Sequence, residues 1–600
     1  MVVLPDVGVA QSAPKVTVDK NVMIAMRDRV RLATDIYRPA ASGTFPAILV
    51  RSPYGKDGLS GDAAFFAEQG YAYIAQDARG RFNSEGTFEM YVQDPADGLD
   101  TALWLNTQSW FNKQQGFAVY GDSYLASSAL STAEMHPPNL KAAYVSFASA
   151  NYHDDGAWRG GAFQLAHNVF FTAVTACPSY LARAASPSAH NEAKVPLPAG
   201  GDTRLMFDLQ SATPLDQGLL SNNCPWYRDW VTNPDENWFW NQPGLNHAGY
   251  FDQLPSIPMA FLSGWYDQFL GGTIVDAQSV PPGQPVSLTI GPWIHEQMDH
   301  PNAGDGYFGQ SATVDRRTEA LHWFNRYVKG GDTAGPEPDT VRYFLMGGGS
   351  GHASAGQIDI GGSWQTAPAW PPPEVQYVPY YLRSGGALSP NKPRGESPDT
   401  YEYDPHEPVP TIGGNISSGA VFAPAGAYVQ RCRRDSPACR DSTHDLGSRA
   451  DVLTYQTDPL DEDLQVAGPL VVQLWAASDA ADTDFTAKLI DVYPNGDAVN
   501  VADGIIRARY AEEKAEPRFV TADTVHQYTI DLLHTAILFK AGHRVRVDIS
   551  SSNFPHYDRN LNTGNEIGND VLDNAVVATQ TVFHDAAHAS HIILPVMPSD

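Results

Sequence analysis

The chain of 600 residues and 65.2 kDa is longer than one hydrophobic core usually supports, so two or three domains are expected. Hydrophobic residues make up 42% of the chain and aromatic residues 11%, which excludes disorder as its main state. The 39 basic and 68 acidic residues give a net charge of −29, which argues against a nucleic-acid partner, and no apolar run approaches the roughly 18 residues of a membrane span.

The first half of the chain alternates short apolar runs with stretches of helical periodicity. The segment GDAAFFAEQG has the pattern of a short helix that ends at Gly70, and DPADGLDTALWLNTQ carries apolar residues at helical spacing. Strands interleaved with helices predict the α/β class, with a mostly parallel sheet covered on both faces. The predicted strands are Phe45–Val50, Tyr71–Gln76, Phe117–Tyr120, Ala142–Phe147, Met259–Leu262 and Val286–Ile290.

Residues 151–250 interrupt this alternation with many Trp, Asn, Pro and Gly residues. We expect a mainly helical cap there, inserted into an α/β core formed by residues 1–150 and 251–348. The character changes again near Gly347, where GGGSGHASAG is predicted to be a linker. Alternating runs such as VVQLWAA and HRVRVDIS follow, and they predict a β-sandwich of the jelly-roll type over residues 349–600.

The cysteines and the N-terminal segment bear on the compartment. Two close cysteines in a polar loop, Cys432 and Cys439, favour a local disulfide, with unpaired thiols in a cytosolic protein as the alternative. The first residues lack the basic and apolar regions of a signal peptide, although Gly8 and Ala10 would suit a cleavage site if translation started further upstream. These features favour a secreted or periplasmic protein, and a cytoplasmic protein is the alternative.

The segment FAVYGDSYLA places Gly121 and Ser123 where a predicted strand meets a helix of small residues. This arrangement is typical of a nucleophile elbow, in which a sharp turn exposes the serine hydroxyl beside the helix N-terminus. The second glycine of the usual G-x-S-x-G pattern is replaced by Leu125. A serine that only caps the helix is therefore the competing interpretation.

A nucleophilic serine needs a histidine base and an acid that orients the base, and in this fold the acid precedes the histidine. Asp267 comes directly after the strand-like PMAFLSGWY, and His295 directly after VSLTIGPWI. Both residues should therefore lie at the carboxyl edge of the sheet, where ligands bind in α/β folds. The rivals that lack this placement are Asp252, Asp276, His300 and His322.

Longer segments carry a resemblance to a known family. They are RDRVRLATDIYRP, RSPYGK, IAQDARGRFNSEG, YGDSYLA, SGWYDQF and IGPWIH in the first half, and DTDFTAKLIDVYPNG and AGHRVRVDISSSNFPHYDRNLNTG in the second. On these motifs the chain resembles the cocaine-esterase and glutaryl-acylase branch of the X-Pro dipeptidyl-peptidase-like serine hydrolases. One departure is Ala126, where the family usually has glycine.

The resemblance implies a three-part architecture and specific residue roles. It implies an α/β-hydrolase core with an inserted helical cap and a C-terminal jelly roll, and it assigns Ser123 as nucleophile, His295 as base and Asp267 as orienter. It also implies an oxyanion hole made of the Tyr54 hydroxyl and the backbone N–H of Tyr124.

The resemblance further suggests an acyl pocket and a supporting network. Trp158 and Phe269 fall where family members line this pocket, although aromatic residues in a cap or core more often serve packing. The segment DARGR, from Asp77 to Arg81, is interpreted as a structural Asp–Arg network that braces the loop beside the site. The sequence has neither an H-E-x-x-H motif nor clustered His and Cys ligands, so no metal or cofactor is expected.

The residues after Asp267 bear on the substrate. Family members that take α-amino acid esters or amides carry acidic residues two and three positions after the aspartate, where this chain has Phe269 and Leu270. A buried ammonium without a partner is costly, so a free α-amine is disfavoured. The expected function is cleavage of carboxylic esters with an apolar or aromatic acyl group through an acyl-enzyme.

Two other functions are weighed against this one. The nearer alternative is an amide or β-lactam side-chain acylase, or an activity of the X-Pro dipeptidyl-peptidase type. The alternative of a different class is a carbohydrate-binding protein with an inactive hydrolase core. The expected partner is a small-molecule ester or amide, without nucleic acid or membrane, and assembly into a homo-oligomer is left open.

Overall fold

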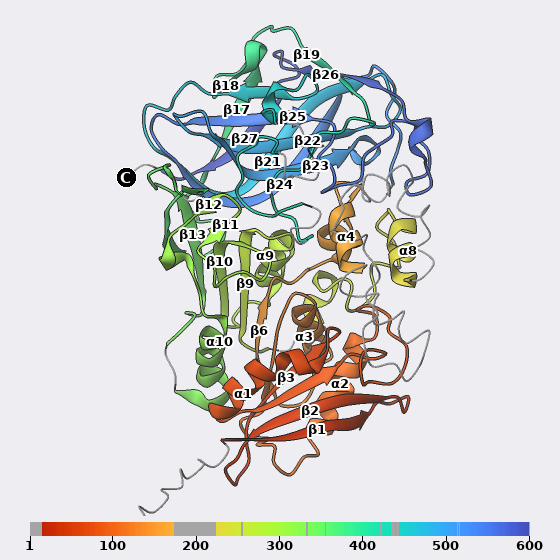
Figure 1. Ribbon diagram of the computed structural model, residues 1–600, viewed down its shortest axis with the longest axis vertical. Helices are drawn as coiled ribbons and strands as arrows, with labels where there is room; N and C mark the ends of the chain where they lie inside the picture. The colour runs from red at the N-terminus through yellow and green to blue at the C-terminus, as the bar shows by residue number, and fades with distance from the viewer. Residues whose placement is uncertain are drawn as a thin grey trace, which may run out of the picture.

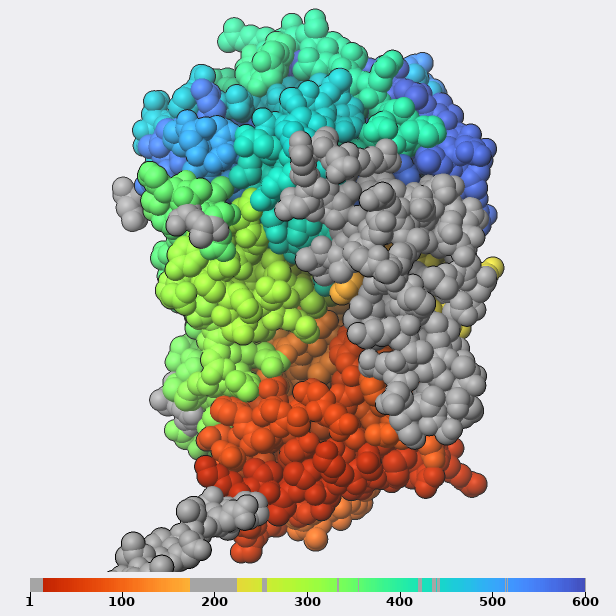
Figure 2. Space-filling view, in the orientation of Figure 1, coloured from red at the N-terminus to blue at the C-terminus, as the bar shows by residue number. Residues whose placement is uncertain are grey.

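The structure is a computed structural model in which the chain forms an elongated molecule (Figure 1). The N-terminal strands lie at one end and the C-terminal strands at the other, as the space-filling view also shows (Figure 2). The residues that the structure describes are 15–172, 224–253, 256–331, 334–354, 356–418, 423–433, 439, 443–512, 514 and 516–598.

A twisted sheet forms the α/β core. Its strand order is β1-β2-β4-β3-β5-β6-β9-β10-β13-β16, parallel from β4 to β13 and antiparallel at both margins. The strands are β1 (Val16–Ala25), β2 (Arg31–Pro39), β3 (Ala47–Ser52), β4 (Ala72–Asp77), β5 (Phe117–Asp122), β6 (Leu140–Ser146), β9 (Met259–Tyr266), β10 (Val286–Ile294), β13 (Thr340–Gly347) and β16 (Gly362–Ala367). Each of the six strands predicted from apolar runs corresponds to one of these parallel strands, with ends displaced by a few residues.

Alternate side chains of the parallel strands enter two separate apolar cores. On β3, Ala47 and Leu49 belong to the core that also includes residues of α2, α3 and α9, whereas Ile48 and Val50 belong to the core that includes residues of α1 and α10. These helices are α1 (Ser60–Glu68), α2 (Asp94–Leu105), α3 (Tyr124–Glu134), α9 (Leu270–Ser279) and α10 (Arg316–Phe324). Because both faces are covered, consecutive strand residues must all be apolar, which explains the unbroken apolar runs of the sequence. The predicted α/β class is confirmed.

The cap predicted over residues 151–250 is described only in part, because residues 173–223 lie outside the described residues. Its described elements are η2 (His153–Ala157), β7 (Trp158–Arg159), β8 (Ala162–Phe163), α4 (Leu165–Phe170), α8 (Pro225–Thr232) and η4 (Ala248–Gln253). Figure 1 shows α4 between α3 of the core and the C-terminal strands, with α8 beside it. No helix among the described residues is long and apolar enough to cross a membrane.

The C-terminal part is the predicted β-sandwich. Its antiparallel layers include β17-β27-β21-β24 and β20-β25-β22-β23. Inward side chains such as Leu474 on β21, Leu489 on β22 and Val547 on β25 belong to one core. The strands are β17 (Gln376–Arg383), β18 (Ala387–Ser389), β19 (Asp399–Tyr403), β20 (Leu453–Gln456), β21 (Leu464–Ser478), β22 (Asp484–Val492), β23 (Ala498–Arg507), β24 (His526–Phe539), β25 (Arg544–Ser550), β26 (Ala578–Phe583) and β27 (His591–Val596).

The junction between the core and the sandwich differs from the predicted linker. The stretch after Gly347 carries β14 (Ala353–Ser354), which pairs with β15 (Gln357–Asp359). Through β15 it joins a small sheet with two strands of the core, β11 (Asn302–Ala303) and β12 (Gly306–Tyr307). Strand β16 returns to the margin of the core sheet, beyond the predicted core limit at residue 348. The end of β13 also pairs with β24, with Met346 opposite Ile537. Backbone hydrogen bonds therefore join the two parts directly.

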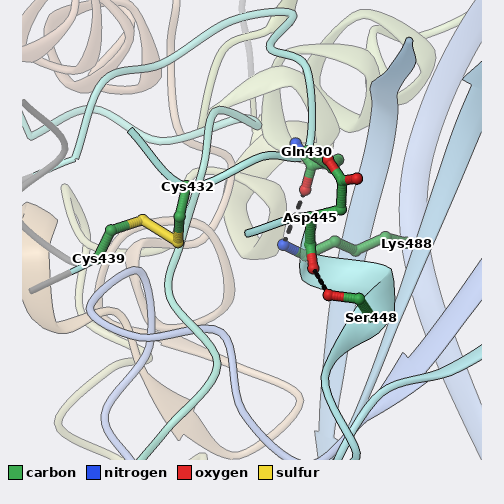
Figure 3. Close-up of a disulfide and its surroundings, with 6 residues drawn as sticks. All are labelled: Gln430, Cys432, Cys439, Asp445, Ser448 and Lys488. Carbon is green, nitrogen blue, oxygen red and sulfur yellow. Dashed lines mark hydrogen bonds between the residues drawn. A yellow bond between two sulfur atoms is a disulfide. The ribbon is translucent and has the colours of Figure 1, made fainter. Parts of the chain in front are cut away.

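The local disulfide predicted from the sequence is confirmed. Cys432 is bonded to Cys439 with their Cα atoms 5.5 Å apart, in a loop beside β22 (Figure 3). The same loop is tied to the sandwich by Gln430, whose side-chain oxygen accepts a hydrogen bond of 3.3 Å from Lys488. Cys224 is also disulfide-bonded, and Cys177 lies outside the described residues.

Candidate active site

Ser123 occupies the sharp turn between β5 and α3. Its backbone has φ 54° and ψ −126°, a conformation that non-glycine residues rarely adopt and that strains the chain. The Ser123 N–H donates to the Ser146 carbonyl at 2.9 Å, which anchors the turn to β6. A Cβ atom at Gly121 would lie 2.4 Å from the Leu125 carbonyl group, so only glycine allows the helix to begin this close to the strand.

The two residues predicted to accompany Ser123 meet it at the carboxyl edge of the sheet. His295 Nε2 lies 2.8 Å from Ser123 Oγ, and His295 Nδ1 lies 2.7 Å from Asp267 Oδ1. Ser123 follows β5, Asp267 follows β9 and His295 follows β10, and these strands lie in the order β5-β6-β9-β10. Parallel strands bring their carboxyl ends to one edge, which explains how residues 172 positions apart become neighbours.

Asp267 is fully buried and held in a fixed orientation. The Ser263 hydroxyl donates to Asp267 Oδ2 at 2.9 Å, and the Asp267 N–H donates to the Gly264 carbonyl at 3.0 Å. One Asp267 oxygen is therefore left to accept the hydrogen bond from His295. The rival Asp276 lies on α9, fully buried and without a hydrogen-bond partner in the described part of the chain.

Two opposing effects act on the His295 imidazole. Burial lowers its pKa, but the adjacent carboxylate of Asp267, through its charge and its hydrogen bond, outweighs burial and raises the pKa above the usual 6.5. Glu296 adds to this increase. The side chain of His295 remains 15% exposed, so its free edge can reach a bound molecule.

Tyr54 and Tyr124 lie beside Ser123, as the sequence prediction required of an oxyanion hole. Their rings meet edge to face with centroids 6.2 Å apart, and the Ser123 side chain is close enough to affect the pKa of the Tyr54 hydroxyl. Burial, reinforced by the charge of Glu296, raises the pKa of Tyr54 well above its ordinary value, so the hydroxyl keeps its proton. Tyr54 can therefore act as a donor at any physiological pH.

The side chain and the backbone of Tyr124 have separate tasks. Its hydroxyl donates to Asp94 Oδ2 at 2.8 Å and accepts from the Tyr91 N–H at 3.0 Å, while its ring stacks on that of Tyr91. The side chain thus fixes the first turn of α3. The N–H of a first helical residue has no acceptor within its own helix, so the Tyr124 N–H is available to a ligand.

Within residues 77–81, Arg79 forms the Asp–Arg pairs of the expected network, with Asp28 and Asp97, whereas Asp77 and Arg81 make other contacts. Asp77 accepts backbone N–H bonds from Lys56 at 2.6 Å and Asn83 at 3.2 Å. Burial raises the pKa of Asp77 to about 6. Arg81 is 1% exposed and donates from Nε to the Pro53 carbonyl at 2.7 Å, directly before Tyr54. Arg81 thus supports the Tyr54 loop, which the motif alone did not reveal.

The two aromatic residues predicted for the acyl pocket differ in their surroundings. The ring of Phe269 lies 5.4 Å from the imidazole of His295. Trp158 is fully buried, packs against Phe163, and donates its indole N–H to the Trp230 carbonyl at 3.0 Å. Phe269 therefore has direct contact with the site, whereas Trp158 has the contacts of a core residue in the same apolar cluster.

The sequence analysis did not identify a histidine and a glutamine that lie beside Phe269 and Asp267. The ring of His167 lies 5.6 Å from Phe269, and its Nδ1 hydrogen-bonds the Ser417 carbonyl at 2.7 Å. Burial lowers the pKa of His167 to about 3, so the ring is neutral. Gln268, next to Asp267, accepts the Ser417 N–H at 3.2 Å. No local signal could have found these contacts, because His167 and Ser417 are 250 residues apart.

Comparison with known proteins supplies the family. The profile of the X-Pro dipeptidyl-peptidase (S15) family matches residues 28–297, and that of the X-Pro dipeptidyl-peptidase C-terminal non-catalytic domain matches residues 336–593. The cocaine esterase of Rhodococcus sp. (strain MB1 Bresler) is 35% identical, with 97% of this chain and 99% of that protein covered. The chain belongs to the S15 family. It is a serine hydrolase, as the resemblance in the sequence implied.

Solved structures of other proteins share the fold of this S15 member over nearly its whole length. An α-amino acid ester hydrolase has a TM-score of 0.80 and 26% identity, with 99% of both chains covered. An aminopeptidase from the marine sediment archaeon Thaumarchaeota archaeon has a TM-score of 0.79 with 24% identity and 99% of both chains covered, a likeness of fold alone. The fold is therefore shared with other proteins over nearly the whole chain.

The tight approach at Gly121 gives a prediction about stability. Gly121→Ala would force a methyl group against the backbone of α3, so it should destabilise the protein by about 1–3 kcal/mol or more. The matched control is Gly61→Ala in α1, where a Cβ atom meets nothing within 4 Å and alanine favours the helix. Thermal unfolding should show a lower midpoint only for Gly121→Ala, and equal midpoints for the two variants would contradict the argument.

Proposed function

We propose that this protein cleaves carboxylic esters with an apolar or aromatic acyl group, with Ser123 as nucleophile, His295 as general base and Asp267 as its orienter. The single observation that carries the proposal is the continuous chain Ser123 Oγ–His295 Nε2 at 2.8 Å and His295 Nδ1–Asp267 Oδ1 at 2.7 Å. The hydrogen bond to buried Asp267 favours the tautomer in which Nδ1 carries the proton, which leaves Nε2 free to accept one.

In the first half-reaction the serine is acylated. Ser123 Oγ attacks the carbonyl carbon of the ester while its proton passes to His295 Nε2. The carbonyl π electrons move to oxygen and form a tetrahedral oxyanion. When this intermediate collapses, the bond to the alcohol oxygen breaks and that oxygen takes the proton from His295. The alcohol leaves, and the acyl group stays on Ser123.

The oxyanion is the charge that the site has to stabilise. The Tyr54 hydroxyl and the Tyr124 N–H are the two donors in this proposal, and both are fixed before the substrate arrives. The buried guanidinium of Arg81 lies behind the Tyr54 loop and adds positive charge on that side. Fixed donors in a site of low polarity stabilise the transition state more than water does.

In the second half-reaction water releases the acid. His295 takes a proton from a water molecule, whose oxygen attacks the acyl carbon and forms a second oxyanion in the same hole. Collapse breaks the bond to Ser123 Oγ, which recovers its proton from His295. The carboxylic acid leaves, and the enzyme returns to its starting state without a cofactor.

The proposed type of acyl group follows from the residues that surround Ser123. Phe269 and the neutral ring of His167 line this side, together with tyrosines of the same apolar cluster. Positions 269 and 270 lack the acids that would bind a free α-amine. The names of the similar cocaine esterase and α-amino acid ester hydrolase also point to ester substrates. A benzoyl ester is therefore the preferred test substrate.

Substitution of the three linked residues tests the assignment. Ser123→Ala should lower kcat on a benzoyl ester by about 10⁶ and abolish labelling by a fluorophosphonate. Asp267→Asn should cost about 10⁴ because it favours the wrong imidazole tautomer. The matched controls are Ser131→Ala, on the same helix, and Asp276→Asn, the rival acid, and both should remain active. Loss of activity in Asp276→Asn with retention in Asp267→Asn would reverse the assignment of the acid.

The pH dependence of kcat/KM has a defined direction. His295 acts only when neutral, so the rate should fall as the pH drops through its pKa, which the carboxylate of Asp267 holds above 6.5. Asp267→Asn removes that charge, so the remaining activity should persist to lower pH than in the wild type. A profile whose acid limb does not move in Asp267→Asn would show that another group controls the ionisation.

Removal of the Tyr54 hydroxyl tests the oxyanion hole. Tyr54→Phe should reduce kcat by about 10²–10³, or roughly 2.7–4 kcal/mol, with a much smaller change in KM. The matched control is Tyr120→Phe, which removes a buried hydroxyl that has no hydrogen-bond partner within the described chain and that faces the opposite core. Wild-type kcat in Tyr54→Phe would mean that two backbone N–H groups form the hole instead.

A further inference from the structure

Gln268 is the middle residue of the acid loop, residues 267–269, which connects the end of β9 to the start of α9. Its side chain is fully buried, and both ends of the amide are hydrogen-bonded. Gln268 Oε1 accepts the Ser417 N–H at 3.2 Å. Gln268 Nε2 donates to the Asp155 carbonyl at 3.2 Å and to the Gly156 carbonyl at 3.4 Å. One neutral side chain therefore connects the acid loop to the C-terminal part and to η2 of the cap.

The backbone of Gln268 is held by the buried side chain of Arg159, whose Nη2 donates to the Gln268 carbonyl at 2.9 Å. Arg159 belongs to β7 of the cap, and the carbonyl of the next residue, Gly160, accepts the Arg507 N–H of β23 at 2.7 Å. A Cβ atom at Gly160 would lie 2.1 Å from the Ile505 carbonyl oxygen, so the backbones of cap and sandwich are in direct contact here. The guanidinium that binds the acid loop is thus itself attached to the sandwich.

The groups that Gln268 binds are themselves fixed. Asp155 Oδ2 accepts two backbone N–H groups, at 2.9 and 3.1 Å, and the Asp155 carbonyl also accepts a hydrogen bond of 2.8 Å from Gln164. The Ser417 carbonyl accepts from His167 Nδ1 at 2.7 Å, so the peptide groups on both sides of this serine are bound. Linked hydrogen bonds in a buried site hold their members in one arrangement. The acid loop is therefore bound to two ordered segments.

These contacts bear on the proposed reacting residues because Gln268 is bonded directly to Asp267. Asp267 Oδ1 lies 2.7 Å from His295 Nδ1, and a displacement of the Gln268 backbone would change that distance. A shift of about 1 Å in a positioned group can lower a rate by about 10²-fold. An amide suits this position, because it donates and accepts at once and adds no charge beside the Asp267–His295 pair.

We propose that Gln268 is a positioning residue: by binding the cap and the C-terminal part at once, it keeps Asp267 within hydrogen-bond distance of His295. Arg159 assists by fixing the Gln268 carbonyl. This inference rests on the proposed role of Asp267 as orienter of the base. It assigns to the contact between Gln268 and Ser417 an effect on the rate, although Ser417 belongs to the domain whose profile is described as non-catalytic.

Gln268→Met tests the proposal, because methionine has a similar length and volume but lacks the amide. On a benzoyl ester it should lower kcat by about 10- to 100-fold and change KM less than about threefold, because the acid is misplaced while the substrate pocket keeps its shape. The matched control is Gln164→Met, which removes a buried hydrogen bond to the same Asp155 carbonyl from a residue outside the acid loop. Both variants should lower the midpoint of thermal unfolding, and Gln164→Met should keep kcat within about twofold.

The pH profile separates positioning from a loss of stability. The charged or titratable groups that act on the His295 imidazole are Asp267, Glu296 and the neutral His167. Gln268→Met removes none of these groups. The Asp267 carboxylate raises the pKa of His295, so its displacement should let that pKa fall and move the acid limb of kcat/KM to lower pH. The control variant should leave the acid limb in place.

A double-mutant cycle shows whether Gln268 acts through Asp267. In the Asp267→Asn background no carboxylate remains to be positioned, so Gln268→Met should reduce kcat further by less than about twofold. An equal fold loss in both backgrounds would mean that Gln268 acts independently of Asp267, which would contradict the proposal. A wild-type kcat and an unmoved acid limb in Gln268→Met would contradict it as well.

His167→Phe provides a second test if Gln268→Met does not fold. It removes the donor to the Ser417 carbonyl but keeps an aromatic ring beside Phe269, and it changes no charge at the site because the His167 ring is neutral. It should lower kcat by about 3- to 10-fold and move the acid limb in the same direction. An unmoved acid limb in this variant would overturn the inference. Retention of wild-type kcat by Asp267→Asn would instead contradict the proposed function itself.

Discussion

The site depends on a backbone turn that the chain adopts only under constraint. Ser123 is held at φ 54°, a backbone conformation that is energetically unfavourable for an L-residue. Contacts of the surrounding residues offset this cost. Strand β5 is buried in the middle of the sheet, its neighbour β6 accepts the Ser123 N–H, and Gly121 lets α3 begin almost in contact with the strand. The strain projects Ser123 Oγ out of the sheet edge and leaves the first N–H of α3 beside it. Both features of the proposed mechanism, an accessible nucleophile and a fixed donor, therefore follow from one turn.

The remaining groups are positioned by parts of the chain that have no chemical role themselves. Asp267 is fixed by Ser263, which lies four residues earlier on β9, and the neighbouring Gln268 binds the backbone of Ser417 in the C-terminal part. The backbone of Ser417 also orients His167 of the cap, against which Phe269 packs. The β-sandwich thus reaches the loop that carries the acid, and the pairing of β13 with β24 joins the two sheets directly. This gives a physical reason why a domain described as non-catalytic accompanies the hydrolase part over the whole chain.

Burial and charge set the protonation states around the site in opposite ways. Burial keeps His167 neutral and Tyr54 protonated, so one wall stays apolar while a hydroxyl donor remains available. At His295 the carboxylate of Asp267 outweighs burial, which makes the imidazole a better base.

The sequence by itself determined the fold class and the residues that follow each central strand. Buried parallel strands need unbroken apolar runs, and Gly121 and Ser123 stand at a strand-to-helix junction, so local patterns carried this information. The roles of Tyr54 and Tyr124 came from the resemblance to a family. Only the tertiary structure decided that Arg81 supports the Tyr54 loop, that the predicted linker after Gly347 joins a small sheet of the core through β15, and that His167 meets Ser417. These contacts join residues that are far apart in the chain, and they form only when folded helices and strands pack against one another. No local pattern of residues encodes that packing.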